Sequence, residues 1–131
     1  MSETEAYAAQ VANRLNPGDV VLLGGELGAG KTAFVRGACA ALGVRGPVTS
    51  PSFVIGNIYP GDPEVAHLDL YRLDSIAFAD ELELEDFLTP RRIGFVEWPH
   101  GGEPGGVAAR ARVTLEHAGG DDRLITTEWL S

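Results

Sequence analysis

Short apolar runs alternate with amphipathic stretches along this chain, so strands and helices are expected to follow one another. Residues 19–24 hold four successive apolar residues after an Asn-Pro-Gly-Asp turn signal, a pattern typical of a fully buried strand. Residues 31–42 return apolar side chains at helical spacing, and Gly43 supplies a C-terminal stop. The pattern therefore predicts a strand, a short glycine-rich loop and a helix in direct succession.

The same two patterns, short apolar runs for strands and apolar residues at helical spacing for helices, predict the remaining elements. Ser2 and Glu5 have the spacing of a capping box at the start of a helix. The further expected helices are residues 3–15 and 75–88, and the further expected strands are residues 53–59, 65–71, 93–97, 110–117 and 123–130. Turn residues join the first two of these strands and also the last two, which predicts two hairpins. This order predicts an α/β fold with a mixed β-sheet flanked by helices, in a single domain over residues 1–131.

Composition and charge narrow the class of protein. With 131 residues, 44% hydrophobic and 22% charged, the chain has the make-up of a water-soluble globular domain. No apolar run is long enough to cross a bilayer and no signal-peptide pattern is present, so we expect no membrane association and a cytoplasmic location. The net charge of −9 argues against direct binding of nucleic acid by this chain without a partner protein. The acidic residues 80–86 fit a solvated helix face, with a docking surface for a basic partner as the alternative.

The loop after the first expected strand carries the strongest chemical signal. Residues 25–32 read Gly-Glu-Leu-Gly-Ala-Gly-Lys-Thr, which matches the phosphate-binding pattern of glycine, four residues, then Gly-Lys-Thr. Glycines let backbone N–H groups approach phosphate oxygens at a helix N-terminus. Lys31 is the only lysine among ten basic residues, and its compact ammonium can follow the β- and γ-phosphates. The sequence therefore predicts a nucleoside triphosphate site.

Two carboxylates at strand ends are candidates for the rest of the phosphate chemistry. Phosphoryl transfer needs Mg²⁺ held by the hydroxyl of Thr32 and a group that orients the attacking water. Asp69 and Glu97 each lie at the end of an expected strand, and either could reach the magnesium directly or through a water. The alternative for each is an ordinary surface carboxylate. His67 is expected to face solvent or a polar neighbour rather than to act in catalysis.

Four motifs together resemble one protein family. They are the phosphate loop at residues 25–32, Ser-Pro-Ser-Phe at 50–53, His-Leu-Asp-Leu-Tyr-Arg-Leu at 67–73 and Val-Glu-Trp-Pro at 96–99. In this order and at these intervals they are similar to the TsaE family, formerly YjeE. These are the small ATPases of bacterial threonylcarbamoyladenosine tRNA modification. The resemblance covers nearly the whole chain.

The resemblance implies a P-loop NTPase sandwich that uses ATP and Mg²⁺. It implies Lys31, Asp69 and Glu97 as catalytic residues. Metal ligands would be Thr32, Ser52 and Glu97. Nucleotide contacts would come from Glu26, Leu27, Gly28, Ala29, Gly30, Lys31, Thr32, Ala33 and Arg123.

Three features depart from the family pattern. Ser52 replaces the usual threonine of the switch-like segment, which keeps the hydroxyl group and loses a methyl group. His100 follows Glu-Trp-Pro where the family has an acidic or amide residue, so we expect no catalytic role at this position. We expect the strand that precedes the first helix in the family to be missing here, and its contacts to the nucleotide base are not assigned.

The resemblance implies an ATPase that is slow on its own. It would serve the threonylcarbamoyl modification of adenosine 37 in tRNAs reading ANN codons, with TsaD and TsaB as partners and tRNA contacted through that complex. A small-molecule kinase is the alternative that the phosphate loop allows, although no segment offers an acceptor pocket or an arginine-rich lid. A GTPase is disfavoured, because an Asn-Lys-x-Asp motif would need a second lysine.

Overall fold

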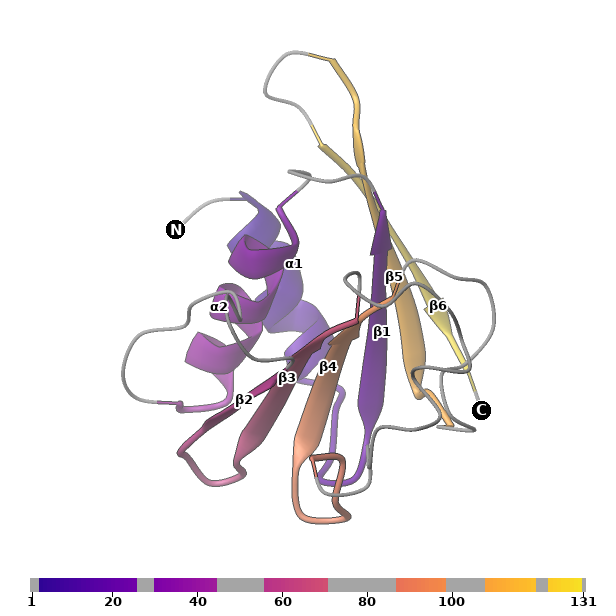
Figure 1. Cartoon of the computed structure of the whole chain (residues 1–131). Helices are drawn as coiled ribbons and strands as arrows, with labels where there is room; N and C mark the ends of the chain where they lie inside the picture. Colours follow the sequence, from indigo (N-terminus) through magenta and orange to yellow (C-terminus); the bar gives the residue numbers. More distant parts are fainter. Residues whose placement is uncertain are drawn as a thin grey trace.

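A mixed β-sheet forms the centre of the computed structural model, which describes residues 3–25, 30–44, 56–70, 87–98, 108–119 and 123–130 (Figure 1). The elements are α1 (Glu3–Ala12), β1 (Val20–Gly25), α2 (Lys31–Ala41), β2 (Gly56–Tyr59), β3 (Val65–Asp69), β4 (Ile93–Glu97), β5 (Ala111–His117) and β6 (Arg123–Trp129). The strand order is β2-β3-β4-β1-β5-β6. The inner strands β3, β4, β1 and β5 are parallel, and the edge strands β2 and β6 are antiparallel to their neighbours. The predicted mixed sheet and both predicted hairpins are confirmed.

Side chains of the inner strands alternate between two hydrophobic clusters, one on each face of the sheet. Val21 and Leu23 of β1 pack with Phe95 of β4 in the cluster that includes α1 and α2. Val20 and Leu22 belong to the cluster on the opposite face. Since both faces are covered, an inner strand needs apolar residues at every position. This explains why the sequence of β1 is a continuous apolar run rather than an alternating one.

Helices α1 and α2 lie together on one face of the sheet (Figure 1). The buried ring of Phe34 joins them to it, with its centroid 6.5 Å from that of Phe95 in β4 and 6.5 Å from that of Tyr7 in α1. Cys39 is buried in the same cluster, and burial raises the pKa of its thiol to about 12. The thiol is therefore protonated and unreactive at neutral pH. No described helix is long and apolar enough to cross a membrane.

Both helices end close to the predicted positions, and backbone hydrogen bonds explain the ends. α1 stops at Ala12 rather than Leu15, because the Leu15 N–H bonds three residues back to the Ala12 carbonyl at 3.0 Å in a tighter final turn. After α2, Gly43 has φ of +80°, and the Val44 N–H bonds to the Cys39 carbonyl at 3.0 Å. These are the features of a Schellman ending, so Gly43 is the stop that was predicted.

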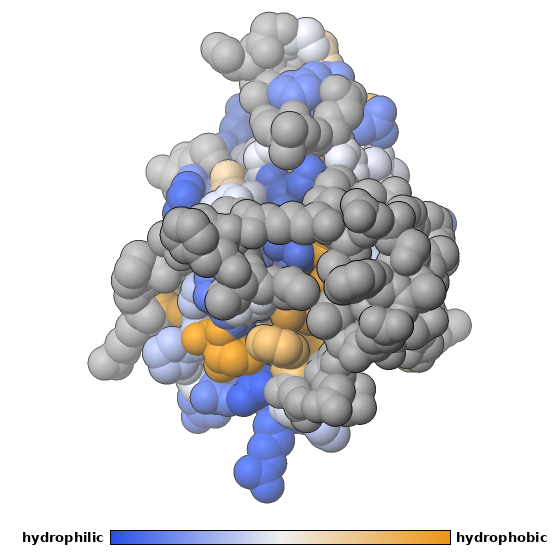
Figure 2. Space-filling view, viewed as in Figure 1, coloured by the Kyte–Doolittle hydropathy of each residue, from blue (hydrophilic) through white to orange (hydrophobic). Residues whose placement is uncertain are grey.

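The face of the sheet opposite the helices is partly covered by Phe87 and Leu88. The sequence predicts a helix over residues 75–88, but 75–86 lie outside the described residues. Phe87 and Leu88 form a turn and a bend instead of helix, and the nearby Pro90 disfavours helical backbone just before it. Ser2 and residues 53–55 of the second predicted strand also lie outside the described ranges. In Figure 2 the described surface is mainly hydrophilic, with a group of hydrophobic side chains over the β2–β4 part of the sheet.

Replacing Gly37 with alanine is expected to destabilise the protein by about 1–3 kcal/mol, because α1 crosses α2 in close contact at this residue. A Cβ built at Gly37 would overlap the backbone of Glu5, and it would lie 2.5 Å from the Glu5 Cα atom. Chemical denaturation followed by circular dichroism measures the change. Helix propensity alone would make alanine more stable than glycine here by about 1 kcal/mol. The sign of the change in unfolding free energy therefore shows whether the close helix contact or helix propensity dominates.

The exposed Ala40 of the same helix provides the control for helix propensity. Ala40→Gly should cost about 1 kcal/mol from propensity alone. If Gly37→Ala raised the stability by a similar amount, the two helices would not approach each other as closely as described.

Candidate functional site

The phosphate-loop motif joins the end of β1 to the start of α2. Gly25 has φ of +125°, and a Cβ there would overlap the backbone carbonyl of Leu115 in β5. Gly30 has φ of +100° and is the N-cap of α2, whose first backbone hydrogen bond runs from the Phe34 N–H to the Gly30 carbonyl at 2.9 Å. Both positions therefore require glycine. The N–H groups of the first helical turn point toward the loop, which is the arrangement that binds anions.

Lys31 is a buried cation at the start of α2, with only 7% of its surface exposed. Its Nζ donates a long hydrogen bond, 3.4 Å, to the carbonyl of Gly25 at the other end of the motif. Burial lowers the pKa of this ammonium, and the negative charges of Glu97 and Asp69 oppose that shift. The ammonium therefore lies within electrostatic reach of both predicted catalytic carboxylates. A flexible cation held in this way can be presented to phosphate oxygens.

Asp69 and Glu97 lie side by side at one end of the sheet. Asp69 is the last residue of β3 and Glu97 the last residue of β4, and the two are direct partners in the parallel register. Glu97 is also paired with Leu23 of β1, just before the phosphate loop. Ligands of open parallel sheets bind outside the carboxyl ends of the strands, which is where these side chains are. The fold thus brings Lys31 and both carboxylates to one place.

His67 holds Glu97 through a buried hydrogen bond that sequence reasoning did not assign to the site. The imidazole is 0% exposed, its Nε2 lies 2.7 Å from Oε2 of Glu97, and its Nδ1 lies 3.0 Å from the hydroxyl oxygen of Tyr59. The expectation of a polar neighbour is confirmed, and solvent exposure is not. One signal in the sequence was available: His67 and Asp69 are two residues apart on a strand, so they share a face.

The oxygen atoms gathered here have the chemistry that suits magnesium. Mg²⁺ prefers oxygen ligands, keeps several waters, and is usually held by one or two carboxylates together with substrate phosphates. Glu97 and Asp69 offer carboxylates, and Thr32 offers a hydroxyl on the first turn of α2. In the described part of the chain no three His, Cys, Asp or Glu residues gather to hold a metal ion. Two carboxylates and one hydroxyl would fit a magnesium ion whose remaining ligands are waters and phosphate oxygens.

Several predicted site residues lie outside the described ranges. These are Glu26, Leu27, Gly28 and Ala29 of the phosphate loop, and Ser52. The backbone of Arg123 begins β6 opposite His117, and its side chain is not described. Ala33 follows Lys31 and Thr32 on the first turn of α2. The nucleotide and metal contacts assigned to all these residues stay predictions.

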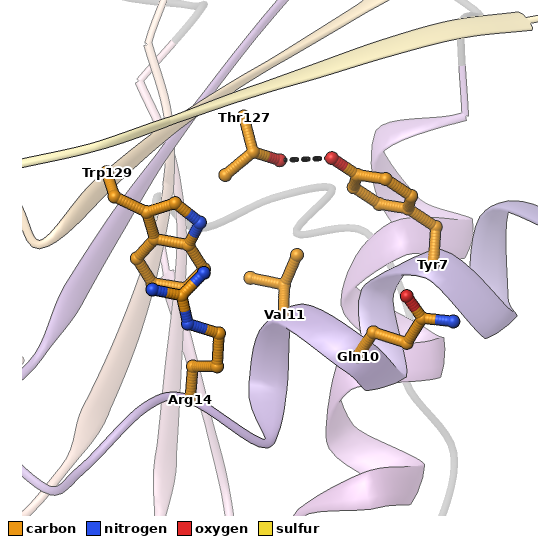
Figure 3. Close-up of a pocket in the computed structure, with 6 residues that line it drawn as sticks. All are labelled: Tyr7, Gln10, Val11, Arg14, Thr127 and Trp129. Atoms are coloured by element: carbon orange, nitrogen blue, oxygen red, sulfur yellow. Dashed lines mark hydrogen bonds between the residues drawn. The ribbon is translucent and has the colours of Figure 1, made fainter.

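A separate hollow of about 160 Å³ lies between α1 and β6 (Figure 3). It is lined by Tyr7, Gln10, Val11, Arg14, Thr127 and Trp129. The hydroxyl groups of Tyr7 and Thr127 are hydrogen-bonded at 2.6 Å, and the Arg14 guanidinium lies 3.9 Å from the centre of the Trp129 ring. These contacts tie α1 to the edge strand. No predicted site residue lines this hollow.

Comparison with known proteins agrees with the geometry. A family model described as threonylcarbamoyl adenosine biosynthesis protein TsaE matches residues 1–125. The tRNA threonylcarbamoyladenosine biosynthesis protein TsaE of Streptomyces coelicolor is 43% identical over an alignment of 116 residues that covers 86% of this chain and 78% of that protein. TsaE of Bacillus subtilis is 37% identical over 125 residues, 95% of this chain and 78% of that protein. The crystal structure of YdiB from Bacillus subtilis superposes with a TM-score of 0.80 at 34% identity, covering 98% of this chain and 80% of YdiB. The chain therefore belongs to the TsaE family of threonylcarbamoyl adenosine biosynthesis proteins.

Proposed function

We propose that this protein binds ATP together with Mg²⁺ at its phosphate loop and hydrolyses the ATP slowly. The observation that carries the proposal is that Lys31, Asp69 and Glu97 lie close together beside the N-terminus of α2. A cation for the phosphates and carboxylates for the metal and the water are what phosphoryl transfer to water needs. The loop residues 26–29 and Arg123 would complete the nucleotide contacts, as the family resemblance implies.

The described side chains suggest a division of tasks within this site. Lys31 would neutralise the β- and γ-phosphates, while Thr32 and Glu97, with Ser52, would hold the magnesium. Bound magnesium supplies positive charge to the phosphoryl oxygens. Glu97 has one oxygen engaged by His67, so its position is restricted and suits a metal ligand better than a mobile base. Asp69 is then the carboxylate that orients the attacking water.

The ATP hydrolysis would serve the threonylcarbamoyl modification of adenosine in tRNA. The relatives from Streptomyces coelicolor and Bacillus subtilis carry the name of that biosynthesis. We propose that homologues of TsaD and TsaB are the direct partners, in the cytoplasm, and that tRNA is contacted through them. The net charge of −9 supports this arrangement, because an acidic surface repels the RNA backbone.

The proposal is tested by measuring ATP hydrolysis with the protein alone, with purified TsaD and TsaB, and with tRNA added. We expect slow turnover alone and stimulation of about tenfold or more by the complex, since a partner can complete the catalytic site. Lys31→Ala in the same complex controls for contaminating ATPases. Efficient phosphorylation of a small metabolite by the isolated protein would instead support the kinase alternative.

A further inference from the structure

We propose that His67 is a positioning residue for ATP hydrolysis, which fixes the carboxylate of Glu97 and is itself fixed by Tyr59. The inference rests on the proposed function, since it assigns a task within the same site. It assigns a role to His67 and Tyr59, which are not among the predicted nucleotide or metal ligands. Their effect would pass entirely through one oxygen of Glu97.

The three side chains form a continuous line across three neighbouring strands. Tyr59 is in β2, His67 in β3 and Glu97 in β4, and all three residues are at least 94% buried, with exposures of 6%, 0% and 5%. In the sheet register His67 is paired with Asn57 and with Phe95. Each hydrogen bond therefore runs diagonally, from His67 to a residue two positions beyond its direct partner. Tyr59 and Glu97 can be bridged in this way because side chains two apart on a strand share a face.

The chemistry of the acceptor decides where the imidazole carries its proton. An ionised carboxylate can only accept hydrogen bonds, so when Glu97 is ionised the Nε2 atom, 2.7 Å from its Oε2, is the donor. The hydroxyl of Tyr59 can then donate to Nδ1 across 3.0 Å. In a neutral ring, this pair of hydrogen bonds places the single ring proton on Nε2. Tyr59 thus supports the tautomer that binds Glu97, in the way outer-sphere groups orient metal-binding side chains.

A carboxylate held in this way has a restricted range of positions. Oε2 of Glu97 is engaged by a ring that cannot rotate without losing two buried hydrogen bonds, so the orientation of the carboxylate group is restricted. Preorganisation of this kind lowers the cost of reorganising charged groups when the reaction proceeds. Losing a supporting residue next to a metal ligand typically costs 10–100-fold in activity or metal affinity. His67 is therefore expected to influence turnover more than nucleotide affinity.

Two amide variants distinguish the effect of the hydrogen bond to Glu97 from the other effects of replacing the His67 side chain. In His67→Gln the amide nitrogen can take the place of Nε2 and still donate to Glu97, whereas in His67→Asn the shorter side chain reaches only the place of Nδ1. We expect His67→Gln to retain turnover within about fivefold of the parent, and His67→Asn to lower kcat by about 30-fold with ATP affinity changed less than threefold. Turnover is measured in the stimulated complex, and His117→Asn, at the exposed end of β5, is the matched control.

A double-mutant cycle asks whether the effect passes through Glu97. If it does, His67→Asn should lower kcat in the parent but hardly at all when Glu97→Gln is already present. Equal losses in the two backgrounds would overturn the proposal. So would equal losses of activity for His67→Gln and His67→Asn that follow their melting temperatures, because those would indicate a purely structural role.

The tautomer provides a readout that needs no ATP. Nitrogen-15 NMR of the nucleotide-free protein should show His67 protonated at Nε2, with its proton resonance shifted in Glu97→Gln and the tautomer mixture changed in Tyr59→Phe. A proton on Nδ1 without one on Nε2 in the parent protein would overturn the proposal even if the protein hydrolyses ATP. If the parent binds ATP but never hydrolyses it with partners present, the proposed function fails, and the Nε2 resonance still decides whether His67 positions Glu97.

Discussion

Replacing Lys31 with alanine is expected to abolish detectable binding of magnesium–ATP, with a loss of affinity of at least about 100-fold, or roughly 2.7 kcal/mol. The ammonium is 7% exposed and lies near the carbonyl of Gly25 at the mouth of the phosphate loop, so it would contact phosphates with little competition from water. No other lysine in the chain can replace it. Isothermal titration calorimetry with magnesium–ATP and magnesium–ADP measures the change.

Arg36 on the same helix supplies a matched control. It is an exposed cation little more than one turn beyond Lys31. Arg36→Ala removes the same charge from α2 and should change ATP affinity by less than about twofold, because exposed charges at this distance are largely screened. Circular dichroism should show that both variants are folded. ATP affinity near that of the parent in Lys31→Ala would refute the phosphate-loop assignment.

Replacing Glu97 with glutamine is expected to lower ATP hydrolysis by about 100-fold or more while ATP binding and folding persist. The substitution removes one negative charge from the proposed metal site and keeps the size of the side chain. The amide oxygen can still accept the hydrogen bond from Nε2 of His67, so the histidine keeps its partner. Loss of one preorganised group in an active site typically costs 10²–10³-fold in kcat. Hydrolysis is measured with TsaD and TsaB across a range of magnesium concentrations.

The exposed carboxylate of Glu116 near the end of β5 provides the control for this change of charge. Glu116→Gln should hydrolyse ATP at the parent rate. Asp69→Asn, measured in parallel, should also lose hydrolysis, because Asp69 is the register partner of Glu97. Parent-like turnover by Glu97→Gln at low magnesium would show that Glu97 does not serve the metal.

The inner strands and α2 were predictable because local pattern and tertiary environment agree. β1 is buried on both faces, so its sequence is apolar at successive positions, and the glycine at position 43 with φ of +80° ends α2 as its place in the pattern suggests. Strand order was not predictable in this way. β1 lies between β4 and β5, which follow it by about 70 and 90 residues, and no local pattern encodes such a pairing.

The sequence by itself determined that this chain has a phosphate-loop motif with one lysine, because the glycines, the lysine and the flanking strand and helix are contiguous along the chain. It also marked Asp69 and Glu97 as carboxylates at strand ends. Only the tertiary structure decided that these two stand side by side near Lys31, and that His67 is buried against Glu97. The physical reason is that these contacts depend on the register between parallel strands, which forms only when distant segments pack on a common core.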